Sequence, residues 1–280
     1  MKRADLEAVL VTARAAAREA GDLVQRAHRK RLVVEHKGAV DLVTQWDRAS
    51  ESLLRERLAP LGFAIVGEEE GGTWDRTAPA FFIDPIDGTT NFVHGHPFWC
   101  VSVGLVAPSG EALLGVVRAP SLGLEHYGLV DDAGGRLARR VSAEGDDDCA
   151  VSQLDRFQDS LLATGFPYDR QAAPENNFDA FVAIKKKCQA VRRCGSAALD
   201  LCLVADGTYD GYWERKLRPW DVAAGIAIVR GAGGRVTDFE GGDAARCLEG
   251  GRVVATNGRI HDVLLDELAN VSPRSLPASK

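Results

Sequence analysis

Two carboxylates stand three residues apart where an apolar run ends. Residues 82–92 read Phe-Ile-Asp-Pro-Ile-Asp-Gly-Thr-Thr-Asn-Phe, so Asp84 and Asp87 directly follow a hydrophobic strand. Pro85 has no N–H group, so we expect strand pairing to end there, and Gly88 permits a tight turn. Two buried carboxylates repel each other, and each is costly to remove from water. A hard divalent cation relieves both costs, because Mg²⁺ prefers carboxylate oxygens and keeps several waters.

The residues that follow could hold a phosphate group. Gly88-Thr89-Thr90 offers backbone N–H groups and hydroxyls, which bind phosphate oxygens in many proteins. The backbone carbonyl of Ile86 could add a metal ligand. The alternative is a polar turn between a strand and a helix, because Asp and Gly are common turn residues.

A second acidic cluster comes directly after the apolar run 64–66. Glu68 stands at the end of that run, as Asp84 stands at the end of the other. If the two strands are parallel neighbours in one sheet, their ends bring Glu68 and Asp84 together. For Glu69 and Glu70 we favour a solvated, charged loop.

The third acid is Asp221, within the sequence Pro-Trp-Asp-Val-Ala-Ala-Gly. It lies in the first turn of an apolar helix, where a carboxylate gains about 0.3–1 kcal/mol from the helix dipole. Trp220 before it and small apolar residues after it predict a buried helix end. A buried acid needs a partner, and a metal ion would serve.

Taken together, these segments resemble the inositol monophosphatase family. The family motifs Gly-Glu-Glu, Asp-Pro-x-Asp-Gly-Thr-x-Asn-Phe and Trp-Asp-x-Ala-Ala-Gly stand here in order, at 67–69, 84–92 and 220–225. The resemblance covers the chain from its N-terminal helix to about Leu268. It implies an α+β fold, a layered αβαβα sandwich of the type shared with fructose-1,6-bisphosphatase. It also implies a Mg²⁺-dependent, lithium-sensitive phosphate monoester hydrolase that is commonly a homodimer.

The resemblance also assigns roles to single residues. Its metal ligands correspond to Glu68, Asp84, the Ile86 carbonyl, Asp87 and Asp221. Gly88 and Thr89 match its phosphate-holding backbone. Asp47 would pair with Thr89 to orient a water that the metal near Glu68 activates, and that water would attack phosphorus without a covalent enzyme intermediate. Asp47 could instead complete a capping box with Thr44, and the two roles could coexist.

The alcohol half of the substrate is assigned to the turn at Gly195 and to Glu214. A helix that opens at Ser196 would present N–H groups, and a Glu214 carboxylate can accept from ring hydroxyls. The resemblance places Arg192 on the substrate side, whereas a salt bridge between lobes or subunits is an equally good use of an arginine pair. The substrate-binding candidates are Asp87, Gly88, Thr89, Arg192, Gly195, Ser196, Ala197, Glu214 and Asp221.

These features favour a phosphatase that converts myo-inositol 1-phosphate to inositol and phosphate. Alternative substrates in the same family are histidinol phosphate and other sugar or nucleotide phosphates. A different class of function is a regulatory protein that keeps the fold and works by binding. The intact set of acids argues that catalysis is retained.

The length, net charge and hydrophobicity of the chain limit the classes of protein to which it can belong. The chain has 280 residues, enough for one large domain or two small ones. Its 40 acidic and 34 basic residues give a net charge of −6, which argues against a nucleic-acid polymer as substrate. No apolar run reaches the roughly 18 residues of a membrane helix, and the charged N-terminus is unlike a signal peptide. We therefore expect a cytoplasmic enzyme with a small-molecule substrate.

The elements that must position these residues follow from periodicity and turn signals. We predict helices over 4–30, 45–58, 174–187, 196–205 and 219–230, and strands over 33–37, 64–66, 80–83, 101–106, 113–118, 124–130 and 209–213. Two further segments, 253–255 and 262–268, complete the alternation of helix and strand in the C-terminal part. Residues 38–42 should form a loop. The strands from 101 to 130 are typical of an antiparallel meander. A polar loop at 144–148 divides the chain into an N-terminal lobe (1–145) with most metal ligands, a C-terminal lobe (146–270) with Asp221 and the alcohol pocket, and a loose tail (271–280).

Overall fold

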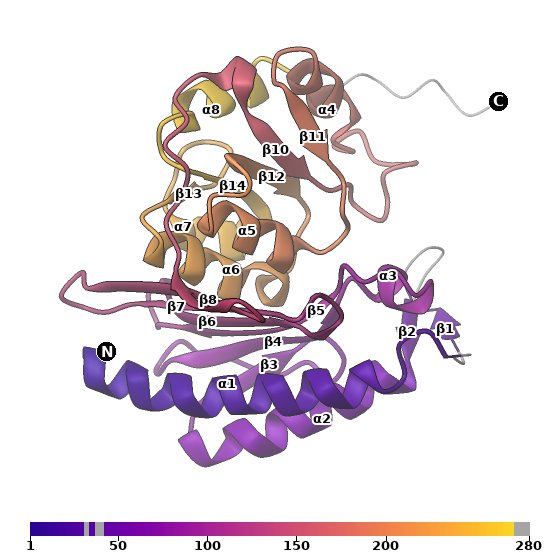
Figure 1. Ribbon diagram of the computed structural model, residues 1–280, viewed down its shortest axis with the longest axis vertical. Helices are drawn as coiled ribbons and strands as arrows, with labels where there is room; N and C mark the ends of the chain where they lie inside the picture. The colour runs from indigo at the N-terminus through magenta and orange to yellow at the C-terminus, as the bar shows by residue number, and fades with distance from the viewer. Residues whose placement is uncertain (31–33, 37–41, 272–280) are drawn as a thin grey trace.

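The computed structural model describes residues 1–30, 34–36 and 42–271, with the backbone alone of 34–36 and 42–43. Its helices are α1 (Arg3–Gln25), α2 (Gln45–Leu58), α3 (Thr89–Val93), α4 (Phe178–Lys185), α5 (Ala197–Ala205), α6 (Pro219–Gly231), α7 (Ala244–Gly250) and α8 (His261–Ala269). Figure 1 shows five layers: α1 and α2, a large sheet, α5 to α7, a smaller sheet, and α4 with α8. This order is the αβαβα sandwich that the family resemblance implies, so the predicted α+β fold is confirmed.

The larger sheet has the strand order β3-β4-β5-β6-β7-β8-β9. Its strands are β3 (Ala64–Gly67), β4 (Ala80–Asp87), β5 (Cys100–Val106), β6 (Ala112–Ala119), β7 (Leu124–Val130), β8 (Arg136–Ser142) and β9 (Gly145–Asp148). β3 and β4 are parallel, and the other neighbours are antiparallel, which confirms the predicted meander. The prediction that pairing ends at Pro85 was wrong. β4 continues to Asp87, and its register with β5 shifts between Asp84 and Asp87 because Pro85 cannot donate to the ladder.

The polar segment 144–148 was predicted to be a loop, and this prediction was wrong. β9 pairs with β8 as the last hairpin of the larger sheet, so the proposed lobe boundary at 145 falls on the first residue of a strand. Asp-rich sequences have low strand propensity. Here Arg139 forms ion pairs with Asp146 at 2.9 Å and Asp148 at 2.7 Å across the hairpin, and cross-strand pairing of opposite charges stabilises it.

The smaller sheet has the order β11-β10-β12-β14-β13. Its strands are β10 (Leu161–Thr164), β11 (Ala190–Arg192), β12 (Gly211–Arg215), β13 (Arg235–Thr237) and β14 (Arg252–Thr256). β12 was predicted to within two residues at each end, and β14 covers the segment 253–255. β10, β11, β13 and α7 were not predicted, because strands of three or four residues and a helix of seven are too short to show a clear period. α4 begins later than predicted because Asn177 before it adopts a left-handed conformation, with φ 71°.

The N-terminal elements match the predicted pattern closely. α1 buries one apolar face and ends at Gln25 rather than at residue 30. α2 begins directly after Thr44, whose hydroxyl accepts the Trp46 N–H at 3.1 Å, as an N-cap does. A short ribbon of β1 (Val34–His36) and β2 (Leu42–Thr44) precedes α2, so Leu42 is in a strand and not in the predicted loop. Residues 37–41 and the tail from 272 lie outside the described residues.

A row of three glycines lets α6 lie directly on the larger sheet. Gly104 pairs with Gly115, which pairs with Gly128, on the neighbouring strands β5, β6 and β7. A methyl group at Gly104 would lie 2.6 Å from the backbone nitrogen of Ala224, and one at Gly115 would overlap the carbonyl group of the same residue. This backbone contact fixes the height of α6 above the sheet, and α6 carries Asp221 in its first turn.

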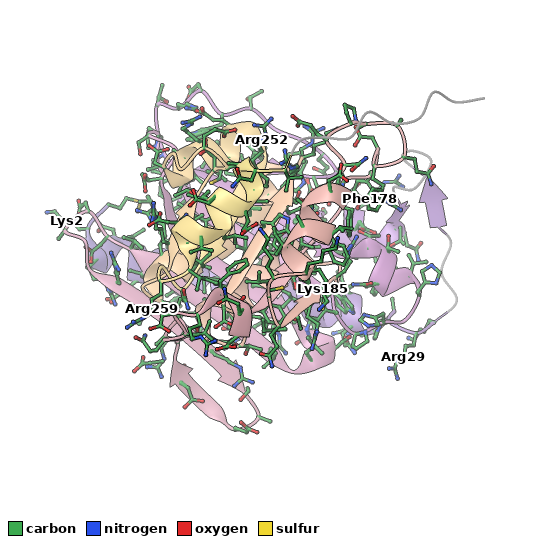
Figure 2. All side chains as sticks on the ribbon, turned by 90° about the horizontal axis from the view of Figure 1, so that it is seen from above. Lys2, Arg29, Phe178, Lys185, Arg252 and Arg259 are labelled. Atoms are coloured by element: carbon green, nitrogen blue, oxygen red, sulfur yellow. The ribbon has the colours of Figure 1, made fainter. Side chains whose placement is uncertain are left out.

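The basic residues labelled in Figure 2 are spread over the molecule. Lys2, Arg29, Lys185, Arg252 and Arg259 lie far apart around the molecule in this view. Among the helices of the described residues, none combines the length and the apolar character needed to cross a membrane.

Candidate metal centre and active site

Parallel strand ends bring Glu68 and Asp84 together. β3 pairs with β4 so that Gly67 faces Ile83, and the next residue of each chain segment is the acid. Asp84 is only 2% exposed, and its Oδ1 accepts the Ile86 N–H at 2.9 Å. Glu68 is partly buried. The adjacency expected from the sequence is present in the structure.

Asp87 connects the larger sheet to the start of α5. It is the last residue of β4 and is buried. Its Oδ2 accepts hydrogen bonds from the Ser196 hydroxyl at 2.6 Å, from the Ala198 N–H at 2.7 Å and from the Cys100 thiol at 3.8 Å. One oxygen of this carboxylate is therefore held by groups from two other elements.

Asp221 reaches the same region from the opposite layer. It is partly buried in the first turn of α6, and its Oδ2 accepts the Arg218 N–H at 2.7 Å. The capping role weighed from the sequence is therefore present. It does not exclude a second role, because only one of the two carboxylate oxygens is used in the cap.

The four acids form one electrostatic cluster. Burial raises the pKa of Asp84 well above its ordinary value, and the charges of Glu68, Asp87 and Asp221 raise it further. Burial also raises the pKa of Asp87, although its hydrogen bonds from α5 oppose the shift. The pKa of Asp221 is raised well above its ordinary value, first by burial and then by the charges of Asp87 and Glu68. A nearby cation stabilises the charged form of buried carboxylates that repel one another.

The donor set fits a hard divalent cation. In Asp84, Asp87 and Asp221 one oxygen accepts hydrogen bonds, and the other accepts none from the described residues. These second oxygens are chemically suited to Mg²⁺. Within the described ranges, no three acidic, imidazole or thiol side chains lie close enough to hold an ion between them as they stand. Because Mg²⁺ keeps several waters, one or two carboxylates for each ion are enough.

Asp47 and Thr89 meet beside these acids. The buried Asp47 accepts the N–H and the hydroxyl of Thr44, both at 2.7 Å, through Oδ2. Its Oδ1 lies 3.3 Å from the hydroxyl of Thr89, which also lies 3.0 Å from the carbonyl oxygen of Ile86. The capping box and the contact with Thr89, which the sequence analysis allowed to coexist, are both present.

The loop after β4 packs tightly against the turn at Gly195. Gly88 has φ 96°, and a methyl group there would lie 3.1 Å from the carbonyl oxygens of Gly195 and Phe98. Asn91 donates to the carbonyls of Phe98 at 2.6 Å and Cys194 at 2.8 Å. The phosphate-holding segment and the turn assigned to the alcohol therefore lie against each other.

The N–H groups at the start of α5 have partners within the protein. The sequence predicted that they would be offered to the substrate, and the structure corrects this. The Ala198 N–H donates to Asp87, and the Leu199 N–H donates to the Ser196 hydroxyl at 3.3 Å. The nearby backbone N–H of Ala197 also lowers the pKa of Asp87. The prediction failed because Asp87 reaches over from β4 and caps α5 from another element.

Glu214 lies in β12 near this turn. Burial raises its pKa to about 7, against the effects of the Tyr212 hydroxyl, which donates to it at 2.5 Å, and of the charge of Arg193. Arg193, rather than Arg192, is the arginine whose charge acts on Glu214. Arg192 is exposed at the end of β11, and its charge acts on Tyr209.

Two buried acids near the site were missed by the sequence analysis. Glu51 is fully buried on α2 and accepts the N–H groups of Glu69 at 2.7 Å and Glu70 at 3.0 Å, so it holds the turn that carries Glu68. Its position on the apolar face of α2, where leucines also lie, was the available signal. Asp200 in α5 is 1% exposed, its Oδ1 has no hydrogen-bond partner among the described residues, and burial raises its pKa.

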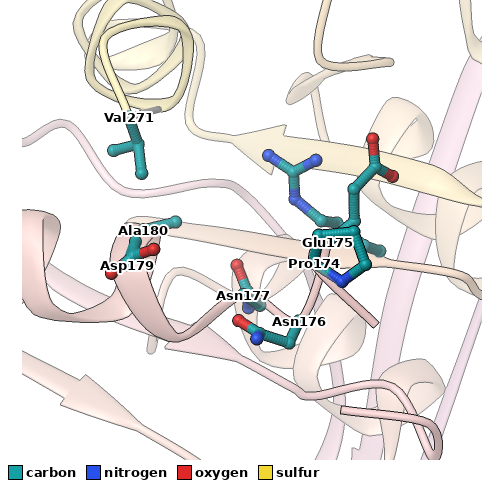
Figure 3. Close-up of a pocket in the computed structure, with 8 residues that line it drawn as sticks. Pro174, Glu175, Asn176, Asn177, Asp179, Ala180 and Val271 are labelled. Carbon is teal, nitrogen blue, oxygen red and sulfur yellow. The ribbon is translucent and has the colours of Figure 1, made fainter. Parts of the chain in front are cut away.

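A separate pocket lies beside α4 (Figure 3). Glu175, Asn177 and Val271 are among the residues that line it. Asn177 is fixed there, because it donates to the carbonyl of Gly165 at 2.7 Å and accepts from the Trp213 indole at 2.9 Å. None of the four clustered acids lines this pocket, so it is not the candidate active site.

Comparisons with known proteins agree with this geometry. A model of the inositol monophosphatase family matches residues 5–272. The chain is 43% identical to an inositol-1-monophosphatase of Synechocystis over 84% of this chain and 80% of that protein. It is also 37% identical to Nus factor SuhB of Pseudomonas aeruginosa over 97% of this chain and 99% of that one. An inositol monophosphatase structure from Anabaena superposes with a TM-score of 0.84 at 38% identity, covering 96% of this chain and 98% of that one.

Proposed function

The chain belongs to the inositol monophosphatase family, a family of metal-dependent phosphatases, and from this premise we propose that it hydrolyses myo-inositol 1-phosphate with Mg²⁺. The observation that carries the proposal is the cluster of Glu68, Asp84, Asp87 and Asp221, in which three aspartates each keep one oxygen without a hydrogen bond from the described residues. A phosphate monoester brings its own negative charge, which such a cluster accepts only with cations present.

The polyol part of the proposal rests on Glu214. This side chain lies beside the acidic cluster, and its charge contributes to the raised pKa of Asp221. As a carboxylate it accepts hydrogen bonds from ring hydroxyls and repels a second phosphate group. A polyol monophosphate therefore suits the site better than a bisphosphate.

When bound, Mg²⁺ would lower the pKa of the attacking water and balance the charge on phosphate and leaving oxygen. Asp84, Asp87 and Asp221 would hold the metal through their second oxygens, together with Glu68 and the Ile86 carbonyl. The backbone N–H groups of Gly88 and Thr89 would bind phosphate oxygens.

The chain itself orients the attacking water through Thr89. A hydroxyl has one proton to donate and lone pairs to accept with. The Thr89 proton lies within reach of Asp47 Oδ1 and of the Ile86 carbonyl. When it is donated to Asp47, the Ile86 carbonyl is left for the metal, and a lone pair of Thr89 accepts a hydrogen bond from the water. Asp47 is buried and held on its other oxygen by Thr44, so it does not rotate away.

A second candidate function is suggested by the relative named Nus factor SuhB, which matches almost the whole chain. A regulatory role that works by binding is therefore a competing proposal. The retained acids favour hydrolysis, because a purely binding protein has no use for a buried cluster of mutually repulsive carboxylates. Lithium sensitivity, a homodimer and a cytoplasmic location stay predictions from the family resemblance.

The test is a panel of phosphate esters assayed with Mg²⁺ and again with excess EDTA. The panel contains inositol 1-phosphate, histidinol phosphate, fructose 1,6-bisphosphate and adenosine 3′,5′-bisphosphate. We expect the highest kcat/KM for inositol 1-phosphate and no turnover in EDTA. Full activity in EDTA would show that the reaction does not need a metal ion. A preference for another ester would show that inositol 1-phosphate is not the substrate. No activity on any ester would favour the binding role.

A further inference from the structure

The two oxygens of Asp87 have different surroundings. Oδ2 accepts from the Ser196 hydroxyl at 2.6 Å, the Ala198 N–H at 2.7 Å and the Cys100 thiol at 3.8 Å. Oδ1 accepts no hydrogen bond from any residue that the structure describes. The carboxylate is therefore held by these three donors through one oxygen.

The donors are themselves held in place. Ser196 is 1% exposed, and its Oγ accepts the Leu199 N–H at 3.3 Å and lies 3.5 Å from the Cys100 sulfur. Cys100 is fully buried and is the β5 partner of Asp87 in the strand register. The three donors thus come from a helix start and a neighbouring strand, both of them rigid elements.

The Ser196 hydroxyl has no proton left to donate to a substrate. A serine hydroxyl has a single proton, and the contact of 2.6 Å gives it to Asp87. One lone pair of the same oxygen is used by the Leu199 N–H. The side chain is almost completely buried, so it has neither a proton nor an exposed surface to offer a ring hydroxyl.

We propose that Ser196 is a positioning residue for the metal ligand Asp87, rather than a group that contacts the substrate. The inference rests on the proposed role of Asp87 in metal binding. By holding Oδ2, Ser196 and the start of α5 leave Oδ1 as the oxygen that meets the ion. A hydroxyl-to-carboxylate hydrogen bond of this length is of the strong, charge-assisted kind. Outer partners of this kind typically change metal affinity by 10–100-fold when removed.

The experiment measures metal binding without substrate. Metal-free protein is titrated with Mn²⁺, and free Mn²⁺ is followed by electron paramagnetic resonance. Ser196→Ala is expected to raise the Kd for Mn²⁺ by about tenfold or more. Ser196→Thr keeps a hydroxyl at the same place and should restore binding to within about threefold. In steady-state assays at saturating Mg²⁺, the KM of Ser196→Ala for inositol 1-phosphate should stay within about twofold.

Controls separate this effect from loss of a helix cap. Asp243 caps α7 through the Arg246 N–H at 3.2 Å and does not contact Asp87. Asp243→Ala should leave Mn²⁺ affinity unchanged. If Ser196→Ala does not fold, Ser196→Cys replaces the donor with a weaker one of similar size, and an intermediate rise in Kd is expected.

The outcomes distinguish the inference from the proposed function. If Asp87→Asn weakens Mn²⁺ binding and Ser196→Ala does not, the positioning role is wrong and the metal role of Asp87 stands. If Asp87→Asn leaves Mn²⁺ binding unchanged, the proposed metal site itself fails. A raised KM for inositol 1-phosphate with normal Mn²⁺ binding would return Ser196 to the substrate pocket.

Discussion

The hydroxyl of Thr89 lies 3.3 Å from Oδ1 of Asp47, although 42 residues separate them in the chain. The start of α2 and the start of α3 are brought together by the end of β4, where Ser50 also donates to the carbonyl of Pro85 at 3.1 Å. The contact therefore depends on the packing of α2 against the larger sheet. Through this contact a buried carboxylate of α2 reaches the proposed reaction centre.

Thr89→Val tests whether this contact serves turnover. Valine keeps the backbone N–H and the shape of the side chain but removes the hydroxyl. We expect kcat to fall by about 100-fold or more with KM little changed, which marks an interaction made mainly in the transition state. Steady-state kinetics on inositol 1-phosphate measures both constants.

The neighbouring Thr90 supplies the control, because its side chain is exposed. Thr90→Val should behave like the unmodified protein. If Thr89→Val raised KM alone, Thr89 would be a binding residue, and Asp47 would serve only as a cap for α2.

Asp221→Asn separates the metal role of Asp221 from its cap. Asparagine can still accept the Arg218 N–H but has lost the charge. We expect the rate to fall by about two orders of magnitude, with the far-UV spectrum and thermal melting retained. Glu70→Gln is the matched control, because Glu70 is 53% exposed and its ion pair with Arg55 is 3.3 Å long. A near-normal rate for Asp221→Asn at saturating Mg²⁺ would leave only the capping role.

Glu214→Gln tests the alcohol pocket. The substitution should lower kcat/KM for inositol 1-phosphate by about tenfold and leave p-nitrophenyl phosphate nearly unchanged, because the second ester has no ring hydroxyls. The pKa of Glu214 is raised to about 7, so its carboxylate form increases between pH 6 and pH 8. The difference between the two proteins should therefore be larger at pH 8. Equal losses on both esters at both pH values would remove Glu214 from recognition.

Glu51→Ala tests the support of the turn that carries Glu68. Removing this buried carboxylate leaves the N–H groups of Glu69 and Glu70 without their acceptor and takes one ion-pair partner from Arg55. We expect the free energy of unfolding to fall by about 3 kcal/mol, measured by urea denaturation. Glu56→Ala on the same helix is the control, because Glu56 is 69% exposed and should change stability by less than about 0.5 kcal/mol. Equal stability of the two variants would show that the turn does not depend on Glu51.

The placement of the acids could be predicted because it depends on local rules. An apolar run that ends in an acid predicts a carboxylate at a strand end, and parallel pairing of β3 with β4 then sets Glu68 beside Asp84. The start of α2 followed from Thr44, whose cap is local to one turn. Such local rules do not decide which residues bind a metal ion. They also do not decide where one lobe ends and the next begins.

Other features depend on contacts between distant segments. The partner of Ser196 is Asp87, 109 residues away, so the sequence gives no sign that the helix start is used within the protein. β9 was missed because its stability comes from Arg139 on the neighbouring strand and not from its own residues. Glu51 was missed because its burial depends on partners 18 and 19 residues away, the N–H groups of Glu69 and Glu70.

The glycine row under α6 limits which substitutions this sequence can tolerate. At Gly104, Gly115 and Gly128 the helix touches backbone, so the sheet has no side chain there that could shrink to make room for an added methyl group. Such a group must lift the helix, and Asp221 moves with it. In a randomised library selected for growth on an inositol phosphate, variants at these three codons should be depleted as strongly as variants of the acids. A map of mutational tolerance would then mark a second zone of intolerance, across the middle of the sheet, in residues that carry no functional group at all.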